Sequence, residues 1–330
     1  MNGSVVGVDL GGTKLAVALL SAGELAESVL RPTDLSSSSA LIDQIVELVE
    51  EVSGDGLHGV GVGVPSVVEF ETGRVVSSVN IPLADVPLRH VLGERLGVPV
   101  FVDNDATVAA LAEAHDDELK LVARNLVMLT IGTGVGGGIV LGGRIYRGSS
   151  GGAGEIGHTI VGLALEGENS VPAAGEFPVA GSLEAVAAGH ALDRLAAEAG
   201  RLYPDSALGR LEASGTKPTG GHAVRAAREG DPVAARIVEV WAERVGIGIA
   251  NAINTFDPNE VVIGGGAALA GDLLLGPATR VARAYAHPGL ADHVTIRLAR
   301  HGVRAGVLGA ALLAVHELEQ SAERSATEVS

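Results

Sequence analysis

The chain contains no cysteine among its 330 residues, which excludes disulfide bonds and thiolate metal sites. Aromatic residues make up only 2% of it and hydrophobic residues 47%, so the core must be built mainly from aliphatic side chains. No run of 18 uncharged apolar residues occurs, and we expect no membrane-spanning segment. The first residues, MNGSVVGVDL, lack a basic region followed by an apolar segment, so we expect a cytoplasmic protein.

Basic residues are scarce: 23 of them stand against 40 acidic residues, which gives a formal net charge of −17. A protein with this charge repels the phosphate backbone of nucleic acids, so we expect no nucleic-acid partner. A small anionic ligand such as a nucleotide remains compatible with it, because backbone N–H groups and Mg²⁺ can bind phosphates locally.

Apolar stretches alternate with helical patterns along the chain, which predicts an α/β protein. We expect strands at 4–10, 14–20, 57–64, 98–102, 125–131, 138–142, 260–263 and 293–298. We expect helices at 38–52, 106–115, 182–199, 232–255 and 304–318, a glycine-rich turn at 132–138, a loop at 201–222 and a disordered tail at 321–330. A strand, a glycine-rich turn and a second strand occur at 4–20 and again at 125–142, which indicates two related halves facing a cleft.

The first glycine-rich turn, from Asp9 to Lys14, combines residues suited to phosphate binding. Glycine lets the backbone approach phosphate oxygens closely, and turn N–H groups can donate to them. Asp9, at the end of a strand, could hold Mg²⁺ through water. An ordinary hairpin turn uses the same residue types, so both interpretations stay open for this motif alone.

The second turn has the spacing G-x-G-x-x-G from Gly132 to Gly137. A dinucleotide-binding fingerprint requires a helix after the turn, whereas Ile139-Val140-Leu141 and the following glycines predict a strand and a hairpin. The dinucleotide interpretation is therefore rejected, and no G-x-x-x-x-G-K-[ST] motif occurs either. Two such hairpins could hold a triphosphate between them.

Two further groups of polar residues are candidates for a substrate site. Asn104 and Asp105 stand where a strand gives way to a helix, and a carboxylate there can accept a proton from an attacking hydroxyl. Helix capping is the alternative for this pair. Glu155 and His158 could hold adjacent sugar hydroxyls by directional hydrogen bonds, or could stand in a solvated loop.

Seven stretches, taken together and in order, resemble the ROK family of sugar kinases and repressors. They are GVDLGGTK (7–14), VNIPL (79–83), VDNDATVAALAE (102–113), LTIGTGVGGGIVLGG (129–143), GAGEIGH (152–158), GSLEAVAAG (181–189) and VVIGGG (261–266). The resemblance to bacterial glucokinases of this family is especially close. It implies a two-lobed α/β fold of the actin-like ATPase (ribonuclease H-like) type, with a cleft between the lobes. We expect one lobe at 1–115, joined by the C-terminal helix at about 303–320, and the other at 116–302.

The resemblance also implies roles in the ATP- and Mg²⁺-dependent phosphorylation of a sugar or sugar-like polyol. Asp105 would be the general base. The sugar would be held by Asn80, Asn104, Asp105, Glu155, His158 and Glu184. The nucleotide would be bound by Asp9 (through Mg²⁺), Gly11, Gly12, Thr13 and Lys14, by Gly132, Thr133, Gly134, Gly136 and Gly137, and by Gly264, Gly265 and Gly266.

The sequence departs from the family at the zinc motif. Zinc-binding members carry a Cys-x-Cys-G-x-x-G-Cys run before the glutamate that matches Glu184, whereas this chain has Gly175, Phe177 and Ser182 at the cysteine positions. Only the fourth ligand, His158, remains, and one imidazole cannot form a tetrahedral zinc site. We therefore expect no structural zinc, and we expect residues 163–182 to be held by packing that buries the ring of Phe177.

Several alternatives remain open. Glucose is the default substrate, but another hexose, an N-acyl hexosamine or a cyclitol would fit the same motifs, and polyphosphate could replace ATP. A sugar-responsive repressor is disfavoured because the first strand begins by Ser4, which leaves no room for a preceding DNA-binding domain. A non-catalytic sugar-binding protein is disfavoured by the presence of Asp105 and both glycine turns. We expect a homodimer or homotetramer.

Overall fold

The computed structural model describes residues 3–54, 56–78, 80–163, 175 and 177–328. The chain folds into two compact units. Unit 1 comprises Met1–Leu126, Gly138–Gly154 and Arg300–Ser330, and unit 2 comprises Val127–Gly137 and Glu155–Ala299. These units differ from the expected lobes, because the first extends beyond residue 115 and also includes the segment Gly138–Gly154.

Unit 1 is built on a six-stranded sheet. Its strands are β1 (Ser4–Leu10), β2 (Lys14–Ser21), β3 (Glu24–Leu25), β4 (Val29–Pro32), β5 (Leu57–Val64) and β8 (Val100–Asn104). The order is β3-β2-β1-β5-β8, with β4 paired to β2. Strand β1 is antiparallel to β2 and parallel to β5, which is in turn parallel to β8. The carboxyl ends of β1, β5 and β8 therefore meet at one edge, where Asp9 pairs with Gly63 and Gly63 with Asp103.

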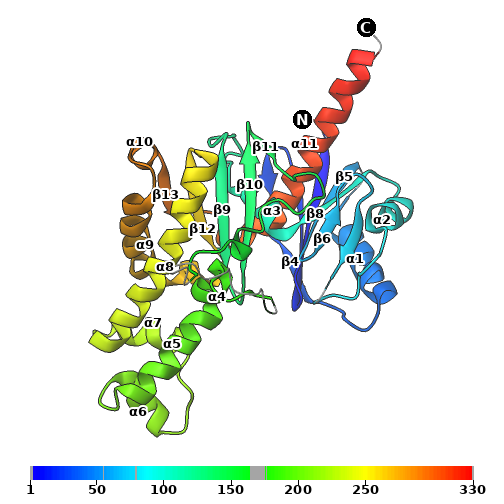
Figure 1. The fold of residues 1–330 in the computed structure, drawn as a ribbon. Coiled ribbons are helices and arrows are strands. Elements are labelled where there is room, and N and C mark those ends of the chain that lie inside the picture. Colours follow the sequence, from blue (N-terminus) through cyan, green and yellow to red (C-terminus); the bar gives the residue numbers. More distant parts are fainter. Residues whose placement is uncertain (1–2, 55, 79, 164–174, 176, 329–330) are drawn as a thin grey trace. The chain divides into compact units, whose positions relative to one another are not determined.

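Helices cover both faces of this sheet (Figure 1). They are α1 (Ser38–Val52), α2 (Leu88–Leu96), α3 (Asp105–Glu113) and α11 (Ala305–Glu328), and a small sheet of β6 (Val67–Glu69) and β7 (Arg74–Ser77) lies beside them. Valines such as Val6 and Val8 pack with α1, whereas the intervening Gly7 faces α11. A Cβ on Gly7 would lie 2.1 Å from the carbonyl oxygen of Val307, so α11 can approach the sheet only at glycine.

Unit 2 contains most of the second sheet, whose order is β11-β10-β9-β12-β13. Its strands are β9 (Leu126–Ile131), β10 (Val135–Leu141), β11 (Arg144–Ile145), β12 (Glu260–Gly264) and β13 (Thr295–Leu298), and the outer part of the β10–β11 hairpin belongs to unit 1. The strand order is the same as in the first sheet, β3-β2-β1-β5-β8, with β9 in the place of β1 and β10 in the place of β2. The predicted internal repeat requires this agreement.

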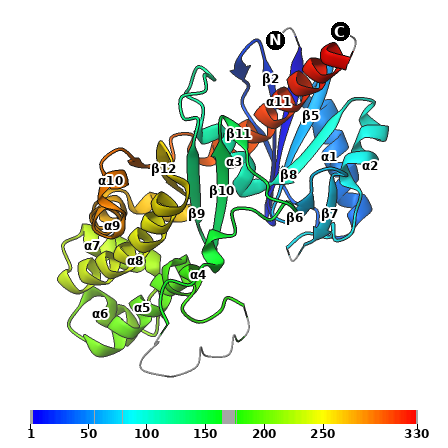
Figure 2. The ribbon, with the colours of Figure 1, turned by 45° about the horizontal axis from the view of Figure 1, so that its top comes forward.

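The helices of unit 2 bury an alanine- and valine-rich core against β9 and β12, and Figure 2 shows α8 and α9 side by side. They are α4 (Leu183–Ala187), α5 (Gly189–Leu202), α6 (Ala207–Ala213), α7 (Gly220–Arg228), α8 (Pro232–Phe256), α9 (Asp272–Tyr285) and α10 (Pro288–Ala291). The short 3₁₀ helices are η1 (Ile156–His158), η2 (Gly266–Ala270) and, in unit 1, η3 (Gly302–Arg304). None of the described helices is long and apolar enough to cross a membrane.

Four local predictions are wrong. The expected loop at 201–222 contains α6 and the start of α7, because Ser206 and Thr219 cap helices soon after Pro204 and Pro218. The expected helix at 182–199 is broken at Ala188 into α4 and α5. The glycine-rich turn is shorter than 132–138, because β10 begins at Val135. The tail expected at 321–330 is helical as far as Glu328.

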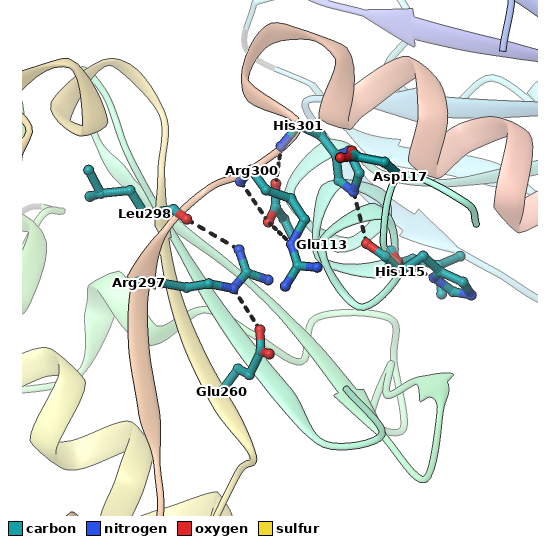
Figure 3. Close-up of polar contacts among 9 residues, drawn as sticks. Glu113, His115, Asp117, Glu260, Arg297, Leu298, Arg300 and His301 are labelled. Atoms are coloured by element: carbon teal, nitrogen blue, oxygen red, sulfur yellow. Dashed lines mark hydrogen bonds and ion pairs between the residues drawn. The ribbon is translucent and has the colours of Figure 1, made fainter. Parts of the chain in front are cut away.

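The chain returns from unit 2 to unit 1 at Arg300, and Glu113 at the end of α3 holds this point (Figure 3). The fully buried carboxylate of Glu113 accepts hydrogen bonds from the backbone N–H groups of Arg300 and His301, at 3.0 and 2.9 Å. The ring of His301 lies 2.9 Å from the carbonyl oxygen of His115. Helix α3 is thus fixed at its C-terminal end to the start of the returning segment.

Candidate active site

Asp9 is the penultimate residue of β1 and lines a cavity of about 590 Å³ in unit 1 together with Gly11, Thr13 and Lys14. Burial and the negative charge of Asp105 raise the pKa of Asp9 to about 6, and Lys14 acts in the opposite direction. A Cβ on Gly306, in the first turn of α11, would lie 2.3 Å from Asp9 Oδ2. Glycine at that position therefore leaves the space that the carboxylate occupies, a requirement that the sequence analysis missed.

Asn104 and Asp105 lie at the predicted junction, with β8 ending at Asn104 and α3 beginning at Asp105. Asn104 is the N-cap of α3, and its Oδ1 accepts hydrogen bonds from the N–H groups of Ala106 and Thr107, at 3.0 and 3.2 Å. Asp105 Oδ1 lies 2.7 Å from the N–H of Ala106. Asn104 is thus the residue that caps α3. Asp105 places a carboxylate at the N-terminal end of this helix, where the helix dipole is positive.

Asn80, the remaining predicted sugar ligand of unit 1, is exposed and lies beside the first glycine turn. A Cβ on Gly12 would lie 3.3 Å from the Cβ of Asn80, so the two backbones pass close to one another. Val79 lies outside the described residues.

The second glycine turn, Gly132 to Gly134, is held by residues from α4 and α5. Glu184 in α4 accepts a hydrogen bond from the N–H of Val135 at 2.8 Å, and a Cβ on Gly134 would lie 2.4 Å from Glu184 Oε2. The N–H of Gly189 donates to the carbonyl oxygen of Gly132 at 2.8 Å. Glu184, predicted as a sugar ligand, therefore also shapes the turn.

His190 in α5 was not among the predicted residues, yet it contacts this turn. Its Nδ1 lies 2.6 Å from the carbonyl oxygen of Thr133. Gly136 and Gly137, which were predicted within the turn, stand instead in β10. No local pattern marks His190, because its contact depends on α5 beginning beside the turn.

A cavity of about 690 Å³ in unit 2 opens beside this turn. Its size is typical of small-molecule sites, which combine apolar walls with a few polar groups. Residues that line it include Gly132, Thr133, His190, Arg225, Trp241 and Gly266. Trp241 is buried, and its Nε1 donates to the carbonyl oxygen of Ala187 at 2.7 Å, so the ring is a fixed wall.

Gly264, Gly265 and Gly266 were predicted to bind the nucleotide, and of these three only Gly266 lines this cavity. Gly265 has a φ of 76°, and a Cβ on it would lie 2.5 Å from the carbonyl oxygen of Ile131. Gly264 packs against Met128, whose Cε would lie 2.4 Å from an added Cβ. These two glycines support the wall by letting the segment after β12 approach β9.

Glu155 and His158 lie together at the 3₁₀ helix η1, with His158 Nε2 3.5 Å from Glu155 Oε2. Both side chains are open to solvent, as binding a sugar requires. A Cβ on Gly157 would lie 2.1 Å from the carbonyl oxygen of Val135, so η1 packs closely on β10.

The region of the missing zinc motif is only partly described, because residues 164–174 and 176 lie outside the described residues. The predicted burial of Phe177 is wrong: the residue is 75% exposed, and its ring meets that of His158 edge-on at 5.3 Å between centroids. Ser182 is buried and caps α4 through the N–H of Ala185. Within the described part of the chain, no three His, Asp or Glu side chains form a group that could hold a metal ion.

Comparison with known proteins gives consistent matches over most of the chain. A model of the ROK family matches residues 5–317. The glucokinase of Halalkalibacterium halodurans is 38% identical over 331 residues, covering 97% of each chain. A ROK family glucokinase from Streptomyces griseus, solved in complex with glucose and AMPPNP, is 32% identical with a TM-score of 0.74, covering 95% of this chain and 100% of that one. The ROK hexokinase from Thermus thermophilus is 34% identical with a TM-score of 0.75, covering 96% and 99%.

Proposed function

This chain belongs to the ROK family, and we propose on that premise that it transfers the γ-phosphoryl group of ATP to the 6-hydroxyl of glucose. It is an ATP-dependent sugar kinase with the actin-like ATPase fold, and its relatives include glucokinases and a glucokinase solved with glucose and an ATP analogue. The observation that carries the proposal is the position of Asp105, which begins α3 directly after β8, at the sheet edge where Asp9 lies near the end of β1.

Unit 1 supplies the proposed base and metal ligand. Asp105 would accept the proton of the attacking hydroxyl, and Asn80 and Asn104 would orient the sugar. Asp9 suits Mg²⁺, because its carboxylate is partly buried beside a second carboxylate and a bound cation would relieve both effects. Mg²⁺ would supply charge neutralisation at the phosphates, while Gly11 to Lys14 would contact phosphate oxygens through the backbone and the lysine ammonium.

Unit 2 supplies the proposed nucleotide site and the remaining sugar ligands. The turn from Gly132 to Gly134 would bind phosphates through backbone N–H groups, and the cavity of about 690 Å³ would take the nucleoside. Glu155, His158 and Glu184 would accept or donate hydrogen bonds to sugar hydroxyls.

The proposed reaction is a direct transfer of the γ-phosphoryl group. As Asp105 takes the hydroxyl proton, the sugar oxygen forms a bond to the γ-phosphorus and the bond from that phosphorus to the bridging oxygen of ADP breaks. Little covalent chemistry falls to the protein, so the rate depends on positioning and on neutralising charge.

Substrate choice is tested by initial rates with ATP or polyphosphate against glucose, mannose, N-acetylglucosamine and a cyclitol. We expect the highest kcat/KM with glucose and ATP. If kcat/KM is higher with another sugar or with polyphosphate, that compound takes the place of glucose or ATP in the proposal. The protein would still be a kinase.

We also propose that the protein is a homodimer or homotetramer, which light scattering can check. We propose no nucleic-acid partner, which a DNA titration can check.

The protein is expected to work without structural zinc, because Gly175, Phe177 and Ser182 stand where relatives have thiolates. Elemental analysis should find no stoichiometric zinc, and activity should survive EDTA once excess Mg²⁺ is restored. One bound zinc per chain, or activity that only zinc restores after chelation, would contradict this expectation.

A further inference from the structure

Arg147, two residues after β11, forms a buried ion pair with Asp103 near the end of β8. Its Nε lies 2.7 Å from Asp103 Oδ2, and the two side chains are 20% and 4% exposed. Burial raises the pKa of Asp103, and the guanidinium of Arg147 opposes that effect. The arginine thus favours the ionised form of a carboxylate that lies two residues before Asp105.

Arg147 is itself held on two further sides. Its Nη2 donates to Glu317 Oε1 of α11 at 3.0 Å. Its guanidinium carbon lies 3.4 Å from the centroid of the Phe70 ring, in the geometry of a cation–π contact. These contacts fix the orientation of the guanidinium. Its ion pair with Asp103 in turn restrains the end of β8.

The other oxygen of Asp103 acts directly on the proposed site. Asp103 Oδ1 accepts a hydrogen bond from the N–H of Asn104 at 2.9 Å. Asn104 in turn caps α3, whose first residue is Asp105. The chain of contacts from Arg147 to the proposed base is therefore one ion pair, one hydrogen bond and one peptide unit.

The backbone of Arg147 closes the glycine-rich loop that leads to Glu155. The N–H of Ala153 donates to the carbonyl oxygen of Arg147 at 3.1 Å. Within this loop, Gly151 has a φ of 83°, and an added Cβ would lie 2.1 Å from the carbonyl oxygen of Val68. The loop is thus fixed at the residue that pairs with Asp103.

A buried ion pair is only weak evidence for a gain in stability, because desolvation offsets most of the attraction between its charges. We propose that Arg147 is a positioning residue for sugar phosphorylation, acting through Asp103 on the Asn104–Asp105 backbone and through its own carbonyl on loop 148–153. The proposal rests on the proposed function, in which Asp105 is the general base.

The test compares wild-type protein with Arg147→Met and with the double variant Arg147→Met/Asp103→Leu. A shift of about 1 Å at a reacting group can cost about 10²-fold in rate. We expect Arg147→Met to lower kcat about 10- to 100-fold, with the KM for ATP changed less than twofold. Arg147→Met leaves both Asp103 and Glu317 without their arginine, and the double variant removes the more buried of these two charges. We therefore expect its Tm to recover in part while its kcat stays low.

Arg297→Met is the matched control. Arg297 Nε lies 2.7 Å from Glu260 Oε2, between β12 and β13, and these side chains are 18% and 17% exposed (Figure 3). We expect a lower Tm in this variant but a kcat within twofold of wild type. An equal loss of kcat in Arg297→Met, or recovery of kcat together with Tm in the double variant, would overturn the proposal.

Hydrogen exchange gives a second measurement that does not depend on activity. We expect Arg147→Met to speed amide exchange both at residues 104–107 and at residues 148–153, and Arg297→Met to leave both segments unchanged. Unchanged exchange in either segment of Arg147→Met would refute the coupling. A wild-type protein inactive on every sugar would instead refute the proposed function, so the two failures are distinguishable.

Discussion

Asp105→Asn is expected to lower kcat by about 10²- to 10⁴-fold and to leave sugar binding largely intact. The amide of asparagine cannot take the hydroxyl proton at neutral pH. Its Oδ1 can still accept the hydrogen bond from Ala106 N–H that the aspartate makes at 2.7 Å, so the start of α3 should persist. Loss of the base should therefore appear in turnover and not in folding.

Single-turnover kinetics measure the rate, and calorimetry with glucose measures binding. Asp272→Asn is the matched control, because Asp272 is the first residue of α9 as Asp105 is of α3. Both changes remove a negative charge from a helix N-terminus, and only the first should affect catalysis. Turnover of at least half the wild-type value in Asp105→Asn would rule out the assigned role.

Gly134→Val is expected to abolish measurable ATP binding in a protein that still folds. An added Cβ would lie 2.4 Å from Glu184 Oε2, so the branched side chain must displace that carboxylate and fill the turn where phosphates would approach. The obstacle is the end of a flexible side chain, which can move with the loss of its hydrogen bond from Val135 N–H but without a backbone clash. Binding should therefore fail while the unfolding transition is retained.

Calorimetry with a non-hydrolysable ATP analogue checks this expectation, and circular dichroism checks the fold. Gly93→Val in α2 is the control for the change itself, because the nearest atom to an added Cβ there is the Val98 carbonyl oxygen at 3.7 Å. Gly134→Ala should give an intermediate affinity. Unchanged affinity in Gly134→Val would show that the turn is only a structural hairpin.

Local signals account for the elements that the sequence predicted well. Helix α8 begins at Pro232, as expected, because Asp231 is a favourable N-cap and proline is favourable as the first residue of a helix. The junction of Asn104 and Asp105 was likewise predicted, because an apolar run ends there in a strong cap. Proline and glycine at 201–222 misled the prediction, because proline is as suitable just before a helix as within a loop.

Contacts between distant parts of the chain could not be predicted. Asp103 and Arg147 are 44 residues apart, and Val135 and Glu184 are 49 apart, so no periodicity relates them. The sequence therefore proposes chemical groups for the site, whereas the contacts that hold those groups in place are visible only in the structure. The continuation of α11 to Glu328 depends on local sequence instead of distant contacts. Ala and Glu in residues 321–328 favour a helix, and the prediction of disorder did not take this preference into account.

The central claim is most directly tested by identifying the product formed from ATP and glucose. Purified protein with Mg²⁺, ATP labelled with ³²P at the γ-position and glucose should yield labelled glucose 6-phosphate and ADP in equal amounts, with ADP release dependent on the sugar. ADP released equally without glucose, with the label found as inorganic phosphate, would contradict the account.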